Sequence, residues 1–207
     1  PVYPPGPHCN PKGLTPLGEH VIRSMMDKGM IVETDHMSMK ARRQTLTILE
    51  EEGYPGVISS HSWGDPGSQK RLQQLGGLVG PISSMSTEFA KEWRFARDNR
   101  DPRFFFGTGF GSDINGLHSQ PPPRPGAAQN PVTYPFRSFD GGSMIHRQRS
   151  GTRVYDINTD GVDHYGLYPD WIEDLRIVAG PQIVDDMANG AEAYLRMWAR
   201  ARAAANR

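Results

Sequence analysis

The chain has 207 residues and equal numbers of basic and acidic side chains, 23 of each, so its formal net charge is zero. This balance gives no electrostatic basis for binding nucleic acid or an anionic membrane, and no apolar run approaches the length of a transmembrane helix. The single cysteine, Cys9, excludes an internal disulfide and leaves the compartment open, while a secreted or cell-envelope location would need an upstream signal.

Glycine and proline determine how much of the chain is expected to be loop. They number 23 and 18, a share well above average usage, so loops should be extensive. Residues 1–12 are predicted to form a proline-rich connector. Because the chain begins with Pro1 rather than Met, we expect it to be a fragment or a processed piece.

A helix is predicted directly after the connector. Thr15 is a suitable N-cap with Pro16 at the first helical position, and Gly29 is a suitable end. The apolar stripe of this helix consists of Leu17, Val21, Ile22, Met25 and Met26. This stripe indicates the side of the helix that packs on a core.

Two predicted strands each lead directly to a histidine. The apolar run at 30–34 precedes His36, and the run at 56–60 precedes His61. A helical pattern that Ser38 can cap lies between the two runs. Two successive βα units would place both imidazoles at the carboxyl-end rim of a parallel sheet, where such folds bind ligands.

The same alternation continues along the chain. A short helix over 66–75 precedes a predicted strand at 78–82, and a helix containing Phe89 and Trp93 precedes a predicted strand at 104–110. Strands that begin at residues 30, 56, 78 and 104 and alternate with helices indicate an α/β fold. Four such units fit either an open doubly wound sheet or half of an eight-stranded barrel.

The regular pattern stops after the fourth predicted strand. Residues 116–166 are expected to form an irregular insertion that could serve as a lid, with a hairpin around 153–155 and 162–165. Residues 156–161 match the first half of a calcium loop, but Leu167 stands where the loop needs a Glu.

Two amphipathic helices are predicted at the end of the chain. One covers roughly 168–179, and the other runs from Pro181 to beyond Trp198. The apolar side of the second helix is expected to carry Ala191, Leu195 and Trp198.

Three side chains at the predicted strand ends could bind or serve a metal ion. His36 and His61 would supply neutral imidazoles, and Asp113 follows the fourth strand on the same rim. A metal there would activate a water molecule, and Asp113 would orient that water or accept its proton. Each residue also has an ordinary structural explanation, because strand-end histidines often bond loop backbone and Ser-Asp-x-Asn-Gly is a common turn.

Six segments together resemble the membrane dipeptidase (renal dipeptidase) family of amidohydrolase-type hydrolases. They are residues 13–18 (GLTPLG), 29–32 (GMIV), 35–38 (DHMS), 60–62 (SHS), 111–116 (GSDING) and 168–170 (YPD). The resemblance covers most of 13–113 and the last forty or so residues.

The resemblance implies a fold, a reaction and a set of site residues. The chain would be the carboxyl-terminal half of a TIM-type (β/α)8 barrel, with 13–115 as four βα units, 116–166 as a long Pro/Gly-rich insertion and 167–207 as helices of the same domain. His36 and His61 would be ligands of a two-zinc centre, with Asp113 as the active-site carboxylate. The reaction would be hydrolysis of a dipeptide or similar small amide by metal-activated water.

The family's remaining ligands and its substrate contacts are less directly matched. Its strand-end His-x-Asp and metal-bridging Glu would lie upstream, so the amino-terminal half of the barrel would be needed. Arg71, His118 and His164 are the candidates for substrate binding. Homo-oligomerisation stays open.

Three rival interpretations remain. One is an enzyme of the same class acting on a non-peptide substrate such as a lactone. Another is a non-catalytic binding module with an incomplete metal site. The weakest is a nucleotide-binding open sheet, because the chain lacks a Gly-rich phosphate loop after its first strand.

Overall fold

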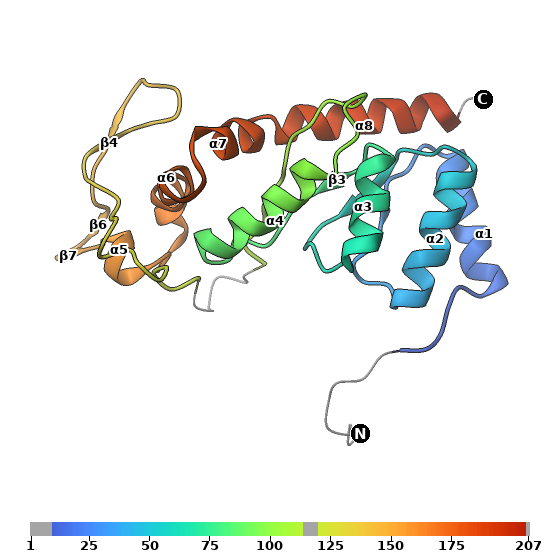
Figure 1. The fold of residues 1–207 in the computed structure, drawn as a ribbon, viewed down its shortest axis with the longest axis horizontal. Coiled ribbons are helices and arrows are strands. Elements are labelled where there is room, and N and C mark those ends of the chain that lie inside the picture. The colour runs from blue at the N-terminus through green and yellow to red at the C-terminus, as the bar shows by residue number, and fades with distance from the viewer. Residues whose placement is uncertain (1–9, 114–119, 206–207) are drawn as a thin grey trace, which may run out of the picture.

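A computed structural model describes residues 10–113 and 120–205 (Figure 1). The longer helices are α1 (Pro16–Asp27), α2 (Met39–Glu51), α3 (Pro66–Gln74), α4 (Ser86–Asp98), α6 (Tyr168–Ala179), α7 (Pro181–Ala188) and α8 (Gly190–Ala205). The short helices are α5 (Ile157–Asp160) and the 3₁₀ turn η1 (Tyr165–Leu167). The strands are β1 (Val32–Glu33), β2 (Val57–Ser59), β3 (Leu78–Val79), β4 (Phe136–Arg137), β5 (Met144–Ile145), β6 (Arg149–Ser150) and β7 (Arg153–Val154).

The first helices begin and end where their capping residues predict. The Thr15 hydroxyl accepts a hydrogen bond from the Gly18 N–H at 3.1 Å, and the Ser38 hydroxyl accepts one from the Ala41 N–H at 3.1 Å. Each bond satisfies a backbone donor that the first helical turn leaves free. After α1 the chain turns at Gly29 with a φ of +64°, a conformation that costs glycine little.

Three parallel strands form a small sheet in the order β1-β2-β3. Val32 pairs with Val57, and Ser59 pairs with Val79. The three valines are buried in a first core that also contains Leu46, Leu49, Leu72, Ile22, Met26 and Ala201. Helices α1, α2, α3 and α8 therefore cover one face of the sheet (Figure 1).

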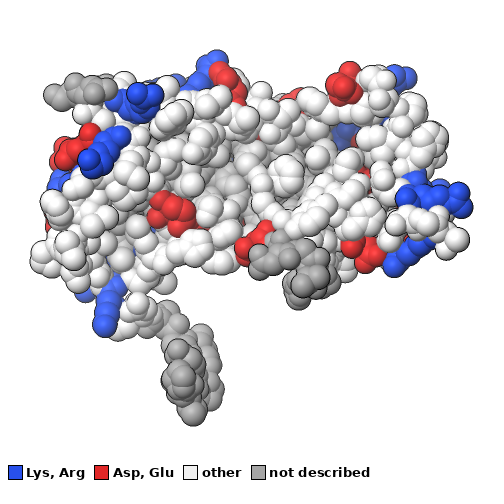
Figure 2. Space-filling model, turned by 180° about the vertical axis from the view of Figure 1, so that it is seen from behind, with Lys and Arg blue, Asp and Glu red and all other residues white. Residues whose placement is uncertain are grey.

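The other face of the sheet is less covered. Glu33, Ile58 and Leu78 lie in one row across the three strands, because Glu33 pairs with Ile58 and Ile58 with Leu78. All three are only partly buried. On the face seen in Figure 2, the basic side chains gather toward the two ends of the molecule, and much of the middle is uncharged.

The fold is mixed α/β with a parallel sheet, as predicted, but the described residues form no barrel. The prediction of a regular fourth strand at 104–110 is wrong. The Gly109 N–H donates to the Val79 carbonyl at 3.1 Å, and Ile82 and Gly111 form an isolated parallel bridge. The segment thus runs beside β3, but its repeated glycines favour an irregular path.

The prediction of one long helix from Pro181 to beyond Trp198 is also wrong, because α7 and α8 are separate helices. A Cβ at Gly190 would lie 2.5 Å from the Thr108 carbonyl oxygen, and a Cβ at Gly107 would lie 2.4 Å from the Asn189 carbonyl oxygen. This close approach of two backbones coincides with the break. The side of α8 that faces the core carries small residues: Ala193 and Ala201 are buried, while Leu195 is 52% exposed.

A second core lies on the other side of α4. It contains Phe89 and Trp93 of α4, Trp171 and Leu175 of α6, Leu167 of η1, and Val132, Phe136, Ile157 and Val162 of the Pro/Gly-rich segment. Residues 120–166 therefore pack on helices rather than standing apart from the fold. Among the described residues, no helix is both long enough and apolar enough to span a bilayer.

The predicted hairpin in this segment pairs different residues. Strands β6 and β7 join Arg149 to Val154 and Ser150 to Arg153, whereas 162–165 lie outside any strand. The half-matched calcium loop is instead the start of α5. There, Asp156 accepts a hydrogen bond from the Asn158 N–H at 3.0 Å and pairs with Arg147.

Candidate functional site

The structure brings His36 and His61 together at the carboxyl ends of β1 and β2. The centres of their imidazole rings are 5.0 Å apart, and the ring planes meet at 75°. The two strands are parallel neighbours, so their ends share one edge of the sheet. The His36 side chain is 60% exposed, so its ring is accessible to a ligand.

Glu33 holds the first of the two histidines. One carboxylate oxygen lies 2.9 Å from His36 Nδ1, and the other accepts hydrogen bonds from the Asp35 N–H at 2.8 Å and the Ser60 hydroxyl at 2.9 Å. Partial burial alone would raise the pKa of Glu33, but the bonds from His36, Asp35 and Ser60 lower it to about 2. Glu33 is therefore ionised at neutral pH.

The charge around His36 is negative. The hydrogen bond to Glu33 and the charge of that carboxylate raise the pKa of His36, with smaller effects from Asp35 and Asp113 in the same direction. Because Nδ1 faces Glu33, Nε2 is the nitrogen left for a ligand. This arrangement, a carboxylate on one imidazole nitrogen, commonly orients metal-binding histidines.

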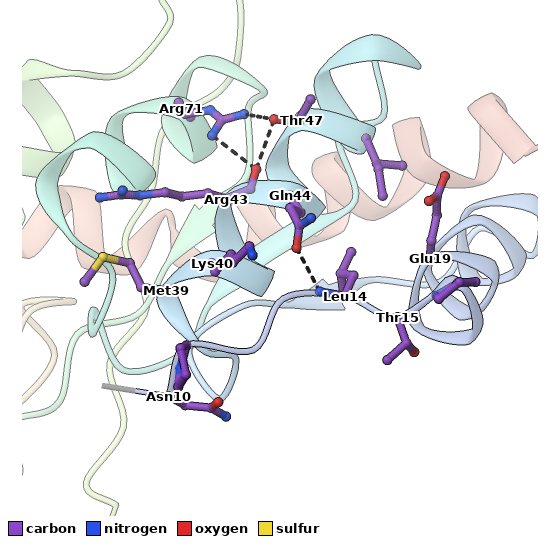
Figure 3. A pocket seen from close by; sticks show the side chains of 13 residues that line it. Asn10, Leu14, Thr15, Glu19, Met39, Lys40, Arg43, Gln44, Thr47 and Arg71 are labelled. Carbon is purple, nitrogen blue, oxygen red and sulfur yellow. Dashed lines mark hydrogen bonds between the residues drawn. The ribbon is translucent and has the colours of Figure 1, made fainter. Parts of the chain in front are cut away.

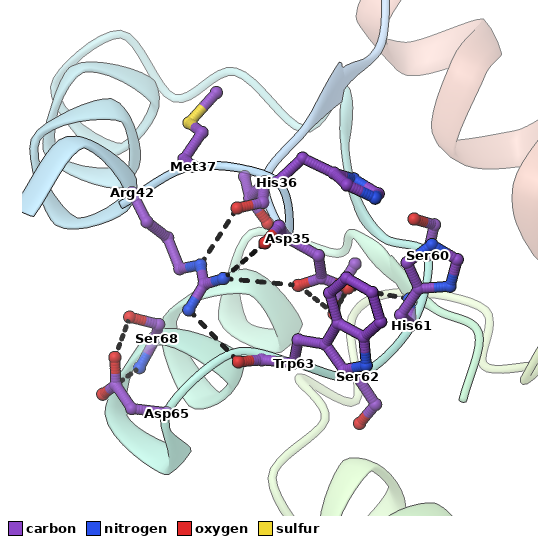
Figure 4. A network of polar contacts seen from close by, with 12 residues as sticks. Asp35, His36, Met37, Arg42, Ser60, His61, Ser62, Trp63, Asp65 and Ser68 are labelled. Atoms are coloured by element: carbon purple, nitrogen blue, oxygen red, sulfur yellow. Dashed lines mark hydrogen bonds and ion pairs between the residues drawn. The ribbon is translucent and has the colours of Figure 1, made fainter. Parts of the chain in front are cut away.

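Asp35 and Arg42 form a buried network beneath the pair (Figure 4). The Asp35 carboxylate accepts hydrogen bonds from the His61 N–H at 2.7 Å and from the Ser59 hydroxyl at 2.8 Å. Arg42 donates to the carbonyls of Thr34 and Asp35, each at 3.0 Å. The network ties the end of β1 to the end of β2 and so fixes the spacing of the two histidines.

The loop after His61 is fixed in the same way. Ser62 has a φ of +60°, which is uncommon for a residue with a Cβ. Gln69 of α3 donates at 2.8 Å to both the carbonyl and the hydroxyl of Ser62, and Arg42 donates to the Trp63 carbonyl at 3.3 Å. The Trp63 ring packs against both imidazoles, 4.4 Å from His61 and 5.4 Å from His36 between centres.

Asp113 lies on the same side of the molecule but completes no metal cluster. Its charge contributes to the raised pKa of His36, and its backbone has a φ of +51°. Within 10–113 and 120–205, no three His, Cys, Asp or Glu residues are grouped closely enough to hold a metal. The described residues thus supply two imidazoles, whereas a catalytic zinc commonly takes three protein ligands.

Arg71 is engaged elsewhere. It donates to Glu50 at 2.7 and 2.6 Å and to the Thr47 hydroxyl at 2.8 Å, which ties α3 to α2. It also lines a cavity of about 800 Å³ between α2 and the start of α1, bordered by Leu14 and Lys40 among others (Figure 3). It makes no hydrogen bond or ion pair with His36 or His61 in the described structure.

The two remaining candidates lie in or near the insertion. His118 falls outside the described residues. His164 is the N-cap of η1, where Nδ1 accepts a hydrogen bond from the Gly166 N–H at 3.0 Å and the ring meets the Tyr155 ring edge-on, with 4.5 Å between ring centres. Its part in substrate binding stays a prediction.

Sequence reasoning missed Arg42 and Trp63. A signal for Arg42 was available, because it stands three and four residues before the buried Thr45 and Leu46 on α2. A charged residue at a core-facing position needs partners nearby, and here strand-end carbonyls supply them. Trp63 gave only the weak signal of an aromatic residue in a Gly- and Ser-containing loop.

No protein-family model, curated protein or solved structure matched the chain.

Proposed function

We propose that the chain belongs to a zinc-dependent hydrolase, similar to the membrane dipeptidases, that cleaves a small amide or peptide bond. The observation that carries the proposal is the pair His36 and His61, 5.0 Å apart at adjacent parallel strand ends. His36 is exposed and His61 is partly buried, and hydrogen bonds to Glu33 and Asp35 hold the two residues at a fixed spacing. Imidazole nitrogen is a preferred zinc ligand.

The chain's own residues would have separate tasks at such a centre. His36 would bind through Nε2 while Glu33 holds its ring, and His61 would bind while Asp35 holds its backbone. When bound, zinc would lower the pKa of a water molecule and polarise a carbonyl oxygen. Asp113, whose charge reaches His36, would accept a proton from that water.

We also propose that the sheet is part of a larger α/β barrel. The row of Glu33, Ile58 and Leu78 is only partly buried, and β1 has no partner strand on its outer side among the described residues. Open strand edges are normally paired or covered. Further βα units beside β1 would cover both features and supply the missing ligands.

Zinc stoichiometry and affinity test the function directly. The wild-type chain should bind zinc, and His36→Ala or His61→Ala should weaken binding by more than about tenfold. His20→Ala is a matched control, since His20 is exposed on α1, away from the strand ends. Absence of bound zinc from the protein with its further βα units, or equal binding after both site substitutions, would overturn the proposal.

Substrate class requires a second measurement. A panel of dipeptides and lactones, each with a chelator control, separates a dipeptidase from an enzyme acting on non-peptide substrates. The chain alone is expected to be inactive, so the panel is run on the protein with its further βα units, and zinc binding there without hydrolysis of any member would favour the binding module.

A further inference from the structure

A cavity of about 310 Å³ lies near the amino ends of β2 and β3, away from the carboxyl ends that carry the two histidines. The turn after α2, the end of α3, the loop after α4 and the last turns of α8 form its walls. Two arginines, Arg103 and Arg200, line it, whereas its described lining contains no Asp or Glu. The charge of this cavity is therefore positive.

Arg200 has no carboxylate partner among the described residues. Its only hydrogen bond there runs from Nη2 to the Gly76 carbonyl at 2.9 Å, and its buried Nε has no acceptor. Its guanidinium also lies over the Phe104 ring, 4.5 Å from the ring centre. Burial lowers the pKa of Arg200, and the charge of Arg196 lowers it further. An anion beside Arg200 would offset both effects.

The neighbouring arginines already have acidic partners. Arg103 binds both carboxylate oxygens of Asp101, with a shortest contact of 2.6 Å, and Arg196 pairs with Glu192 at 2.6 Å. The carbonyl end of α3 faces Arg200 through Gly76, but a helix terminus supplies only about half a negative charge. Arg200 is thus the one arginine of this group whose charge is not balanced.

The rest of the wall is largely apolar. It includes Pro55, Leu75, Ala203 and Ala204. The cavity volume is about ten times the roughly 30 Å³ that one water molecule occupies in the liquid, and it lies at the lower end of the range for small-molecule sites. The space therefore suits an organic body rather than a single inorganic ion.

We propose that this cavity binds a small organic carboxylate, which accepts hydrogen bonds from Arg200 and lays its apolar body against Pro55 and Leu75. A guanidinium matches the two oxygens of a carboxylate in a bidentate pair. One negative charge balances Arg200, whereas a phosphate group carries more than one at neutral pH. The inference needs no metal at the histidine pair, so it stands apart from the proposed hydrolase.

Benzoate is the probe for this site, and three further compounds separate its features. Benzamide lacks the charge, acetate lacks the apolar body, and inorganic phosphate is the alternative anion. Amide NMR titrations of the full chain give each dissociation constant. Benzoate should bind more tightly than the other three compounds, with shift changes at Gly76, Phe104 and Arg200.

Substitutions test the role of the guanidinium. Arg200→Met keeps the length of the side chain without the charge, and it should weaken benzoate binding by about tenfold or more. Arg196→Met is the matched control, since Arg196 lies one turn earlier on α8 and pairs with Glu192. Arg200→Lys keeps the charge without the planar fork, so it should weaken binding less than Arg200→Met does.

Four results would overturn the proposal. They are absence of benzoate binding, equal binding of benzamide or acetate, tighter binding of phosphate than of benzoate, and unchanged binding in Arg200→Met. If Arg200→Met does not fold, the comparison of benzoate with benzamide on the wild type decides whether the charge is used. No zinc is added in these titrations, so none of the results bears on the metal site.

Discussion

The two cores of the molecule are built by different means. The first core packs α1, α2, α3 and α8 on a parallel sheet through aliphatic side chains such as Leu46, Leu49 and Val57. The second packs α4 and α6 against a Pro/Gly-rich segment with little regular structure, mainly through aromatic side chains such as Phe89 and Trp171. The proposed site stands on the first core alone.

More charged side chains are buried around the second core than around the first. Arg124 of the irregular segment pairs with Asp174 of α6 at 2.7 Å, and both side chains are less than a tenth exposed. Ser86 at the start of α4 also donates to Asp174. A segment with few backbone hydrogen bonds of its own thus gains its position from polar contacts with helices. Both cores thus contain a buried ion pair, but the irregular segment of the second core depends more on such single contacts than the helices and strands of the first core do.

Of the changes considered, breaking the buried ion pair between Arg124 and Asp174 should lower the free energy of unfolding the most. Asp174→Ala leaves the Arg124 guanidinium buried without its partner, which should cost about 3–5 kcal/mol of unfolding free energy. Urea unfolding measures this loss. The exposed ion pairs of Arg153 provide a control, because Arg153→Ala should cost about 1 kcal/mol or less.

A double replacement sharpens the same test. Arg124→Met with Asp174→Leu removes both charges and keeps apolar volume, so stability should recover to near the wild-type value. If the double variant is as unstable as Asp174→Ala, the loss comes from shape rather than from an unpaired charge.

Matched cavities should show whether the two cores unfold separately. Leu49 in the first core and Leu175 in the second are both fully buried. Each Leu→Ala change should cost about 2–5 kcal/mol, and amide hydrogen exchange should accelerate mainly in the core that carries the cavity. Uniform acceleration across both cores in either variant would show that they form one cooperative unit.

The first core could be predicted from the sequence because its signals are local. Thr15 and Ser38 cap the helices whose starts they predict, and the strands predicted before His36 and His61 are found, although β1 ends at Glu33 and β2 at Ser59. Helix caps and short apolar runs depend on residues a few positions apart. The meeting of the two histidines followed from parallel strand order alone.

The remainder depended on contacts between distant segments. The buried side of α8 is lined by Gly190, Ala193, Met197 and Ala201, although Leu195 and Trp198 are more hydrophobic. This side of α8 lies too close to the neighbouring backbone for large side chains, since a Cβ at Gly56 would lie 2.8 Å from the Ala201 methyl group. Trp63 was missed for a related reason, because its neighbours Arg42 and Gln69 come from two different helices.

The smallest predicted effect concerns Asp65, which links the first core to the Trp63 loop. Its carboxylate accepts hydrogen bonds from the Ser68 N–H at 3.2 Å and the Ser68 hydroxyl at 2.8 Å, and so caps α3. Asp65→Ala should cost about 1 kcal/mol at neutral pH, measured by thermal or urea unfolding.

The pH dependence of this cost identifies its origin. Partial burial alone would raise the pKa of Asp65, but the bonds from Ser68 and the charge of Arg43 lower it below its ordinary value. A carboxylate with a lowered folded-state pKa contributes stability above its unfolded pKa of about 4, and that contribution is lost as pH falls through the folded value. The stability difference between wild type and Asp65→Ala should therefore shrink in acid.

Asp65→Asn keeps a capping oxygen without the charge, so it should retain most of the stability at neutral pH and lose the acid dependence. An Asp65→Ala difference that stays constant down to the lowest pH would assign the cap to geometry alone.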